Sequence, residues 1–199
     1  MSRLAFCVFS KQLHVAWETG DLVVPLEESR LETILFDTLD PLIQKQKFKS
    51  VIIPAGPAPF TQLRILRATQ LGLATGLRCT ASMINMFDVL FTALSIKTGA
   101  CLLETRRGDH FFQTRKDGQI MERGVTVFDS CTQHLESVSA GTQKNSAKDH
   151  TIISDDPKLA TITITTQNLA KTMLENNFTL HTDLIYGITL PYSTKGIII

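Results

Sequence analysis

The 199-residue sequence lacks an excess of charge of either sign. Its 20 lysines and arginines nearly match its 19 aspartates and glutamates, which leaves a formal net charge of +1. A nucleic-acid backbone is held mainly by clustered positive charge, so this balance excludes binding through a general basic excess. Hydrophobic residues make up 43% of the chain. That content supports a folded core and excludes a disordered protein.

Long apolar runs and paired cysteines are missing as well. No stretch of about 18 apolar residues occurs, so no membrane span is expected. The first residues lack the apolar region and small-residue cleavage site of a signal peptide. The four cysteines stand far apart without a C-x-x-C pair: Cys7, Cys79, Cys101 and Cys131. We therefore expect reduced, structural thiols in a cytoplasmic protein.

The motifs of several enzyme classes are also absent. The five histidines lie far apart without an HExxH or HxxxH pattern, so their spacing predicts no metal site. The segment that begins at Gly56-Pro57 lacks the lysine of a P-loop, and neither GxGxxG nor GxSxG occurs. The sequence therefore predicts no cofactor and gives little support for catalysis by this chain alone.

The hydrophobic pattern predicts an α/β chain that opens with strands. Ser29 and Glu32 form a capping box at the start of the first helix, and Pro41 either ends or kinks that helix. The third helix is expected to start from an N-cap at Ser82. Turns are expected at 107–109 and 117–118, between strands of the second half. The expected strands and helices are strands within 4–26, a helix over 29–46, a strand over 49–54, a helix over 60–75 stopped at Gly76, a strand over 77–81, a helix from 82 to near 99, strands within 100–128 and 150–154, and a helix over 166–177.

This order of elements is that of a ribonuclease-H-like sheet. Three antiparallel strands come first, and strands alternating with helices follow. Such a sheet is one lobe of the actin and Hsp70-type architecture. We therefore expect an α/β, actin-like (ASKHA) fold with two ribonuclease-H-like lobes, formed by residues 1–99 and by a smaller second lobe of residues 100–199.

The helix predicted over 60–75 has apolar residues on several sides rather than in one stripe. At about 100° per residue, three groups separate around the axis: Phe60, Leu63 and Leu71; Leu66 and Leu73; and Ile65, Ala68 and Gly72. A helix that is apolar most of the way round is covered on more than one face. Its own sheet covers one face, and we expect another helix or a partner to cover the rest.

Small residues recur along the same helix. Ala68, Gly72 and Gly76 follow one another at four-residue spacing, which lets a second helix come close. Two interpretations stay open: close packing against the preceding helix of this chain, or a further contact with helices of a partner. Arg64 and Arg67 lie near the apolar patch, either as polar anchors for a partner or as solvated side chains.

Residues 51–76 read VIIPAGPAPFTQLRILRATQLGLATG. This segment resembles the signature of the TsaB family, which has a strand, a GPGSFTGLR-like turn and a helix ending in a GLA-like stretch. The matching residues are Gly56, Pro57, Phe60, Thr61, Leu63 and Arg64, followed by Gly72-Leu73-Ala74. Ala58, Pro59 and Gln62 replace the family's Gly, Ser and Gly. The segment ETRRGDHFF at 104–112 resembles the family's DARRGEVYW-like hairpin, with Arg106 and Arg107 aligned.

The resemblance implies a glycoprotease-like (M22-like) but non-catalytic chain of bacterial tRNA threonylcarbamoyladenosine (t6A) synthesis. Such a chain binds and stabilises a TsaD-like catalytic subunit, with a TsaE-like ATPase as third member, and meets tRNA only through the complex. In the family the first two helices form the interface. The interface residues implied here are Leu31, Ile34, Leu35, Phe60, Leu63, Arg64, Arg67, Ala68, Leu71 and Gly72, beside the motif turn of Gly56, Pro57, Phe60 and Thr61. Arg106 and Arg107 are candidates for contact with RNA or a partner, or are solvated.

Two departures from the pattern argue against nucleotide hydrolysis. Actin-like ATPases open with a strand ending D-x-S/T, and here Cys7 occupies the position of that aspartate. A thiol is a poor ligand for Mg²⁺, which prefers oxygen. The glycines missing at 58 and 62 also remove backbone freedom near a phosphate. The alternatives are a small actin-like ATPase or kinase, an M22-type hydrolase, or a homodimeric regulatory module built from the same two helices. A nucleotide at the joint interface stays an open question.

Overall fold

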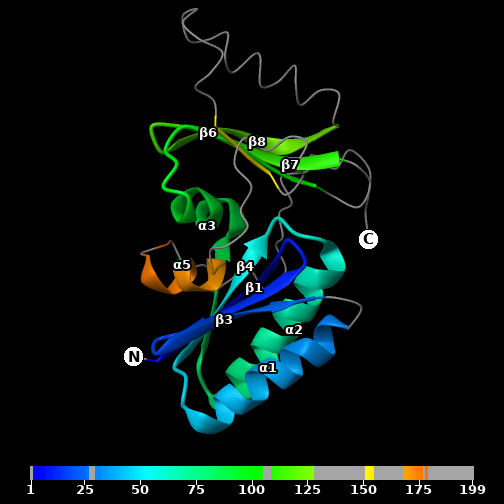
Figure 1. Cartoon of the computed structure of the whole chain (residues 1–199), viewed down its shortest axis with the longest axis vertical. Helices are drawn as coiled ribbons and strands as arrows, with labels where there is room; N and C mark the ends of the chain where they lie inside the picture. The colour runs from blue at the N-terminus through cyan, green and yellow to red at the C-terminus, as the bar shows by residue number, and fades with distance from the viewer. Residues whose placement is uncertain are drawn as a thin grey trace, which may run out of the picture. The chain divides into compact units, whose positions relative to one another are not determined.

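The computed structural model describes residues 2–26, 30–104, 109–127, 151–154, 168–176 and 178 (Figure 1). The chain divides into two compact units. Unit 1 comprises Met1–Leu94 and Thr165–Ile185, and unit 2 comprises Ser95–Ile164 and Tyr186–Ile199. The first boundary lies close to the division expected after residue 99. The expected lobes were continuous, however, whereas a late segment of the chain belongs to unit 1.

Unit 1 is built on a five-stranded sheet of order β3-β2-β1-β4-β5. The antiparallel part consists of β1 (Arg3–Phe9), β2 (Gln12–Trp17) and β3 (Gly20–Pro25). The parallel part adds β4 (Ser50–Gly56) beside β1, and then β5 (Thr80–Asn85) beside β4. This is the ribonuclease-H-like arrangement that the sequence predicted. The central strands are apolar throughout because both faces of the sheet are covered.

Four described helices pack on this sheet, two on each face (Figure 1). α1 (Leu31–Lys45) and α2 (Phe60–Leu77) lie on one face. α3 (Met86–Ala93) and α5 (Leu169–Glu175) lie on the other, where α5 packs against β1, β2 and α3. The core beneath α1 and α2 includes the buried side chains of Leu4, Phe6, Val8, Leu13, Val15, Leu35, Leu39, Val51, Ile53 and Leu66. None of the helices in the described part of the chain is long and apolar enough to cross a membrane.

The first helix starts later than its capping signal indicates, and it continues past Pro41. Its N-cap is Arg30, which makes no side-chain capping bond. Ser29, the expected cap, lies outside the described residues. Of the two possibilities for Pro41, that it ends the helix or kinks it, the first is wrong, because α1 continues to Lys45. Pro41 is exposed, so its ring lies on the solvent side of the helix.

The ends of α2 and α3 also differ from the expectation, because other residues satisfy the backbone there. α2 passes through Gly76 and is closed by Arg78, which takes the left-handed conformation (φ 52°) and donates its N–H to carbonyls of the last turn. Ser82 lies in β5 rather than capping α3. The N-cap of α3 is Asn85, whose Oδ1 accepts from the backbone N–H of Phe87 at 2.8 Å.

Unit 2 contains a four-stranded sheet of order β8-β7-β6-β9. β6 (Gly99–Glu104), β7 (Asp109–Lys116) and β8 (Gln119–Val127) are antiparallel, and β9 (Thr151–Ser154) runs parallel to β6. This order repeats β3-β2-β1-β4 of unit 1. The predicted turn at 117–118 is confirmed, with φ of 52° and 81° as a tight hairpin requires. Arg107, in the other predicted turn, and Arg106 before it lie outside the described residues.

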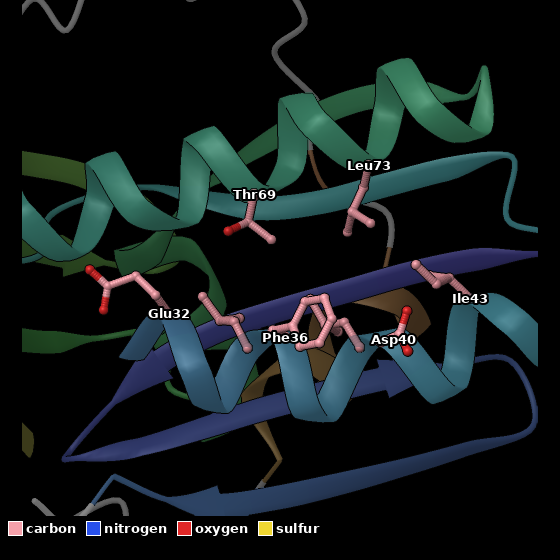
Figure 2. Close-up of a pocket in the computed structure, with 8 residues that line it drawn as sticks. Glu32, Phe36, Asp40, Ile43, Thr69 and Leu73 are labelled. Atoms are coloured by element: carbon pink, nitrogen blue, oxygen red, sulfur yellow. The ribbon is translucent and has the colours of Figure 1, made fainter. Parts of the chain in front are cut away.

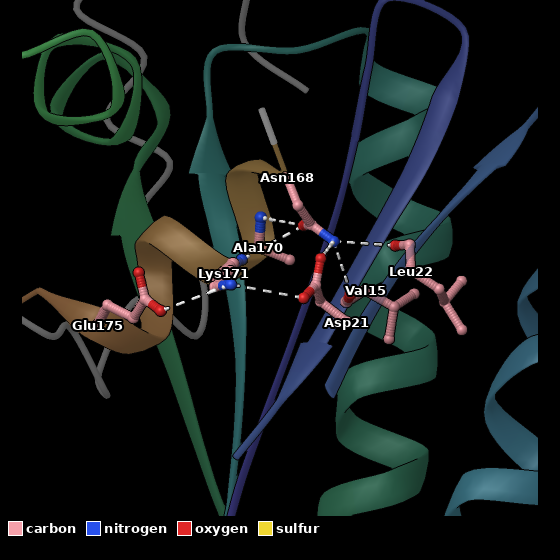
Figure 3. Close-up of polar contacts among 7 residues, drawn as sticks. All are labelled: Val15, Asp21, Leu22, Asn168, Ala170, Lys171 and Glu175. Atoms are coloured by element: carbon pink, nitrogen blue, oxygen red, sulfur yellow. Dashed lines mark hydrogen bonds and ion pairs between the residues drawn. The ribbon is translucent and has the colours of Figure 1, made fainter. Parts of the chain in front are cut away.

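The side chain of Asn168 fixes α5 to the strands of unit 1 (Figure 3). Its Nδ2 donates to the carbonyls of Val15 and Leu22, both at 3.0 Å, which are paired residues of β2 and β3. Its Oδ1 caps the helix by accepting from the backbone N–H groups of Ala170 and Lys171. One amide therefore caps a helix that comes late in the chain and joins it to two strands that come early.

We predict that Asn168→Ala lowers the free energy of unfolding by about 2–3 kcal/mol, from one lost cap and two strand carbonyls that lose a donor. Asn168→Asp separates these roles. Its carboxylate still caps the helix, but it cannot donate, and it faces Asp21, whose Oδ2 lies 3.1 Å from Nδ2 in the native protein. Urea unfolding at pH 7 should show both variants destabilised. An Asn168→Asp variant as stable as the native protein would contradict the donor role.

Candidate protein interface on helices α1 and α2

The start of α2 is held by contacts within the chain. Gly56 has φ of +119°, a conformation that L side chains rarely adopt. A Cβ at this glycine would lie 3.5 Å from Cδ1 of Leu63, so Leu63 faces the turn. Gln62, where the family has glycine, donates its Nε2 to the carbonyl of Val8 at 2.9 Å. This departure from the family motif therefore has a structural role, which is to tie α2 to the end of β1.

The inner face of α2 is fixed by a buried amide that the sequence analysis missed. Gln70 is fully buried, and its Nε2 donates to the carbonyl of Val51 at 2.8 Å and to that of Ser82 at 2.7 Å. Its Oε1 accepts from Nη1 of Arg67. Burial lowers the pKa of the Arg67 guanidinium from its ordinary value. The signal available in the sequence was the position of Gln70, one turn after the buried Leu66.

The outer face of α2 is exposed. Phe60 is 65% exposed and Leu71 is 45% exposed. Ala68, Gly72 and Gly76 of the same helix are exposed as well, and a Cβ built on either glycine would meet no atom within 4 Å. Close packing of these small residues against α1, one of the two interpretations of their spacing, is therefore wrong. The helix presents an open strip of small and apolar residues.

A groove of about 330 Å³ lies between α1 and α2 (Figure 2). Its lining residues are Glu32, Leu35, Phe36, Leu39, Asp40 and Ile43 from α1, and Thr69 and Leu73 from α2. Six of these eight side chains are uncharged, so the groove is apolar with two carboxylates. We call this groove and the exposed outer face of α2, taken together, the helix-pair surface.

Half of the implied interface residues lie on the outer face of α2: Phe60, Arg64, Ala68, Leu71 and Gly72. Thr61 is exposed beside them, and Pro57 lies in the turn before. The remaining residues contact their own chain. Leu35 is 1% exposed, and Leu31 and Ile34 pack against the core of unit 1. Leu63 and Arg67 make the internal contacts described above.

Phe36 is the residue of this surface that sequence reasoning missed. It is 67% exposed, the largest value among the large hydrophobic residues that the structure describes. It directly follows Leu35 and therefore lies outside the apolar stripe of α1. An aromatic residue beside such a stripe was the signal that could have found it.

The position at which the sequence comparison expects an ATPase aspartate is occupied by a buried cysteine. Cys7 is fully buried on β1, opposite His14 of β2, which is 4% exposed. Burial raises the pKa of the Cys7 thiol and lowers the pKa of the His14 imidazole. The pair therefore stays a neutral thiol and a neutral imidazole, and not a reactive thiolate. In the part of the chain that the structure describes, no three His, Cys, Asp or Glu side chains gather as a metal site would require.

Comparison with known proteins found matches only among solved structures; no protein-family model and no curated protein sequence matches. YeaZ from Pseudomonas aeruginosa, a TsaB homologue, is 18% identical with a TM-score of 0.50, over 77% of this chain and 76% of that one. The chain has a YeaZ-like fold. A second P. aeruginosa protein, described as similar to the peptidase YeaZ, is 17% identical over 77% and 74% (TM-score 0.49). A Bacteroides thetaiotaomicron protein with an actin-like ATPase fold is 11% identical over 87% and 86% (TM-score 0.42).

We predict that Gly72→Ala stabilises this YeaZ-like fold by about 0.5–1 kcal/mol, because alanine favours a helix interior and the new methyl group meets no neighbour. The matched control is Gly56→Ala, in which the same substitution meets the strained φ of +119° and should destabilise by about 1 kcal/mol or more. Thermal or urea unfolding measures both. A destabilised Gly72→Ala variant would show that the outer face of α2 is already occupied.

The lowered pKa of His14 predicts that the protein loses stability in mild acid. The unfolded chain takes up a proton near the ordinary histidine pKa of about 6.5, whereas the folded chain takes it up only at lower pH. Stability is therefore full above about pH 6.5 and falls as the pH drops below it. Urea unfolding between pH 7.5 and 5 should show a smaller loss for His14→Leu than for the native protein. Equal losses would contradict this assignment.

Proposed function

We propose that this chain is a TsaB-type, non-catalytic subunit of the t6A modification complex, which binds and stabilises a TsaD-like catalytic subunit through α1 and α2. The observation that carries the proposal is the outer face of α2, which leaves small and apolar residues in solvent on a YeaZ-like fold. The TsaE-like ATPase would join as a third member. tRNA would be met through the complex, in the cytoplasm.

The energetics of the helix-pair surface support docking of another helix pair. Fully burying one large apolar side chain contributes about 1.5–3 kcal/mol. Phe36, Phe60 and Leu71 are 67%, 65% and 45% exposed, so a partner can still gain much of this burial. The small residues Ala68 and Gly72 let a second helix approach at close range, because interaxial distance depends on the side chains at the contact.

The buried pair of Cys7 and His14 supports a non-catalytic role. An ATPase of this architecture requires an acidic oxygen near the end of β1 to hold a metal–phosphate group. Here that position holds a neutral thiol enclosed by the core. A subunit that binds and stabilises another protein does not need this group.

The binding test uses the purified chain, a TsaD-like subunit and two variants of the outer face. Leu71→Glu places a charge in the apolar strip, and Gly72→Leu adds bulk where helices would meet. Each should weaken binding by at least about tenfold, or 1.4 kcal/mol, by calorimetry. Gly72→Leu should keep its own stability, because nothing lies near Gly72. Ile120→Glu on β8, at a residue that is 48% exposed, is the matched control and should bind normally.

Failure of the native chain to bind, or native-like binding by both variants, would contradict the proposal. Turnover of ATP by the chain alone would contradict the non-catalytic part. Light scattering with and without the TsaD-like subunit distinguishes the two possible occupants. A homodimer of this chain that persists after the TsaD-like subunit is added would show that a second copy covers the surface instead.

A further inference from the structure

Two exposed phenylalanines on the helix-pair surface have opposite electrostatic surroundings. Phe60 is followed one turn later by Arg64, whose Cζ lies 5.5 Å from the centre of the Phe60 ring. This distance is that of a cation–π contact. Phe36 is equally exposed, but the residues one turn before and one turn after it are Glu32 and Asp40. The Phe36 ring, whose face carries partial negative charge, therefore has two carboxylates as neighbours rather than a cation.

Phe36 and its two acidic neighbours all line the groove. Glu32, Phe36 and Asp40 follow one another on one side of α1, at the spacing that places side chains next to each other on a helix (Figure 2). They are joined there by Leu73 of α2. The two carboxylates are the only charged groups among the described lining residues, so the charge of the groove is negative.

The carboxylate of Asp40 is already oriented within α1. Nε2 of Gln44 donates to its Oδ2 at 2.6 Å. This bond holds the carboxylate in one position and leaves its other oxygen with acceptor capacity. An incoming cation would therefore meet a carboxylate that is already oriented, beside an exposed ring and an apolar wall.

We infer that the groove between α1 and α2 binds an arginine side chain carried by an amphipathic helix of the partner. That a partner docks at this place rests on the proposed function, whereas the choice of arginine rests on the residues that line the groove. A guanidinium is planar, stacks on an aromatic face and pairs with carboxylates through several N–H donors, whereas lysine offers a compact point charge. Its aliphatic stem packs on Leu73, and its head pairs with the carboxylate of Asp40 beside the Phe36 ring, while Glu32 adds negative charge one turn further along the groove. A helix fits because the outer face of α2, with its small residues, continues beside the groove.

The test uses the full chain and three synthetic amphipathic helical peptides that share one leucine seam and differ at one flanking position: arginine, lysine or glutamate. Fluorescence anisotropy should give binding of the arginine peptide at least about tenfold tighter than that of the glutamate peptide, with the lysine peptide between them. Asp40→Lys should remove this preference. Asp37→Lys makes the same charge change on an exposed residue of α1 that does not line the groove, and should keep it.

A second variant separates the ring from the carboxylates. Phe36→Leu keeps an apolar side chain at an exposed position, so folding should be unaffected. It should reduce the advantage of arginine over lysine while keeping the advantage of lysine over glutamate. Equal binding of the three peptides, no binding of any of them, or equal effects of Asp37→Lys and Asp40→Lys would overturn the inference. These outcomes do not depend on the TsaD-like subunit, whose failure to bind would overturn the proposed function alone.

Discussion

The buried amide of Gln70 determines which side of α2 faces the solvent. Its Nε2 bridges carbonyls of two neighbouring strands, at 2.8 and 2.7 Å, and the side chain is fully buried. A helix held by a directional bond to two strands cannot rotate about its axis without leaving buried carbonyls unsatisfied. Ala68 and Gly72 lie about 200° around the helix from Gln70, at 100° per residue. The interaction that holds α2 on its sheet therefore also presents its small residues outward.

The YeaZ-like fold of this chain encloses a cysteine and a histidine opposite each other on β1 and β2. Cys7 and His14 lie on the face of the sheet that α3 and α5 cover, and both are desolvated. Desolvation favours the neutral form of each group, so Cys7 is held as a thiol rather than as a nucleophilic thiolate. The chemically distinctive groups lie instead on the opposite face, on the outside of α1 and α2. This distribution supports the proposed docking role of α1 and α2.

The sequence was sufficient for the strand order of unit 1, because apolar strands alternating with helices leave few topologies open. Helix ends were harder to predict, because several residues compete for one cap. Asn85 rather than Ser82 caps α3 since Ser82 is held in β5, and α2 passes Gly76 because Arg78 takes the left-handed conformation instead. At the candidate site the sequence predicted the spacing of the small residues but not their direction, which depends on Gln70. Phe36 was missed because it lies outside the apolar stripe of α1.

In the proposed complex, the apolar and the charged residues of the helix-pair surface would have separate physical roles. The exposed rings and the small residues provide burial, which is not directional and accepts any apolar helix. The positions of the charges define an orientation for the partner. The positive Arg64 lies near the start of α2, whereas the negative Glu32 and Asp40 line the groove beside α1. A partner helix docked in the reverse direction, or shifted by one turn, brings its charges against the wrong residues, and like charges brought together in an interface are strongly unfavourable. Affinity would therefore come from the strip on α2, and the choice and direction of the partner from α1.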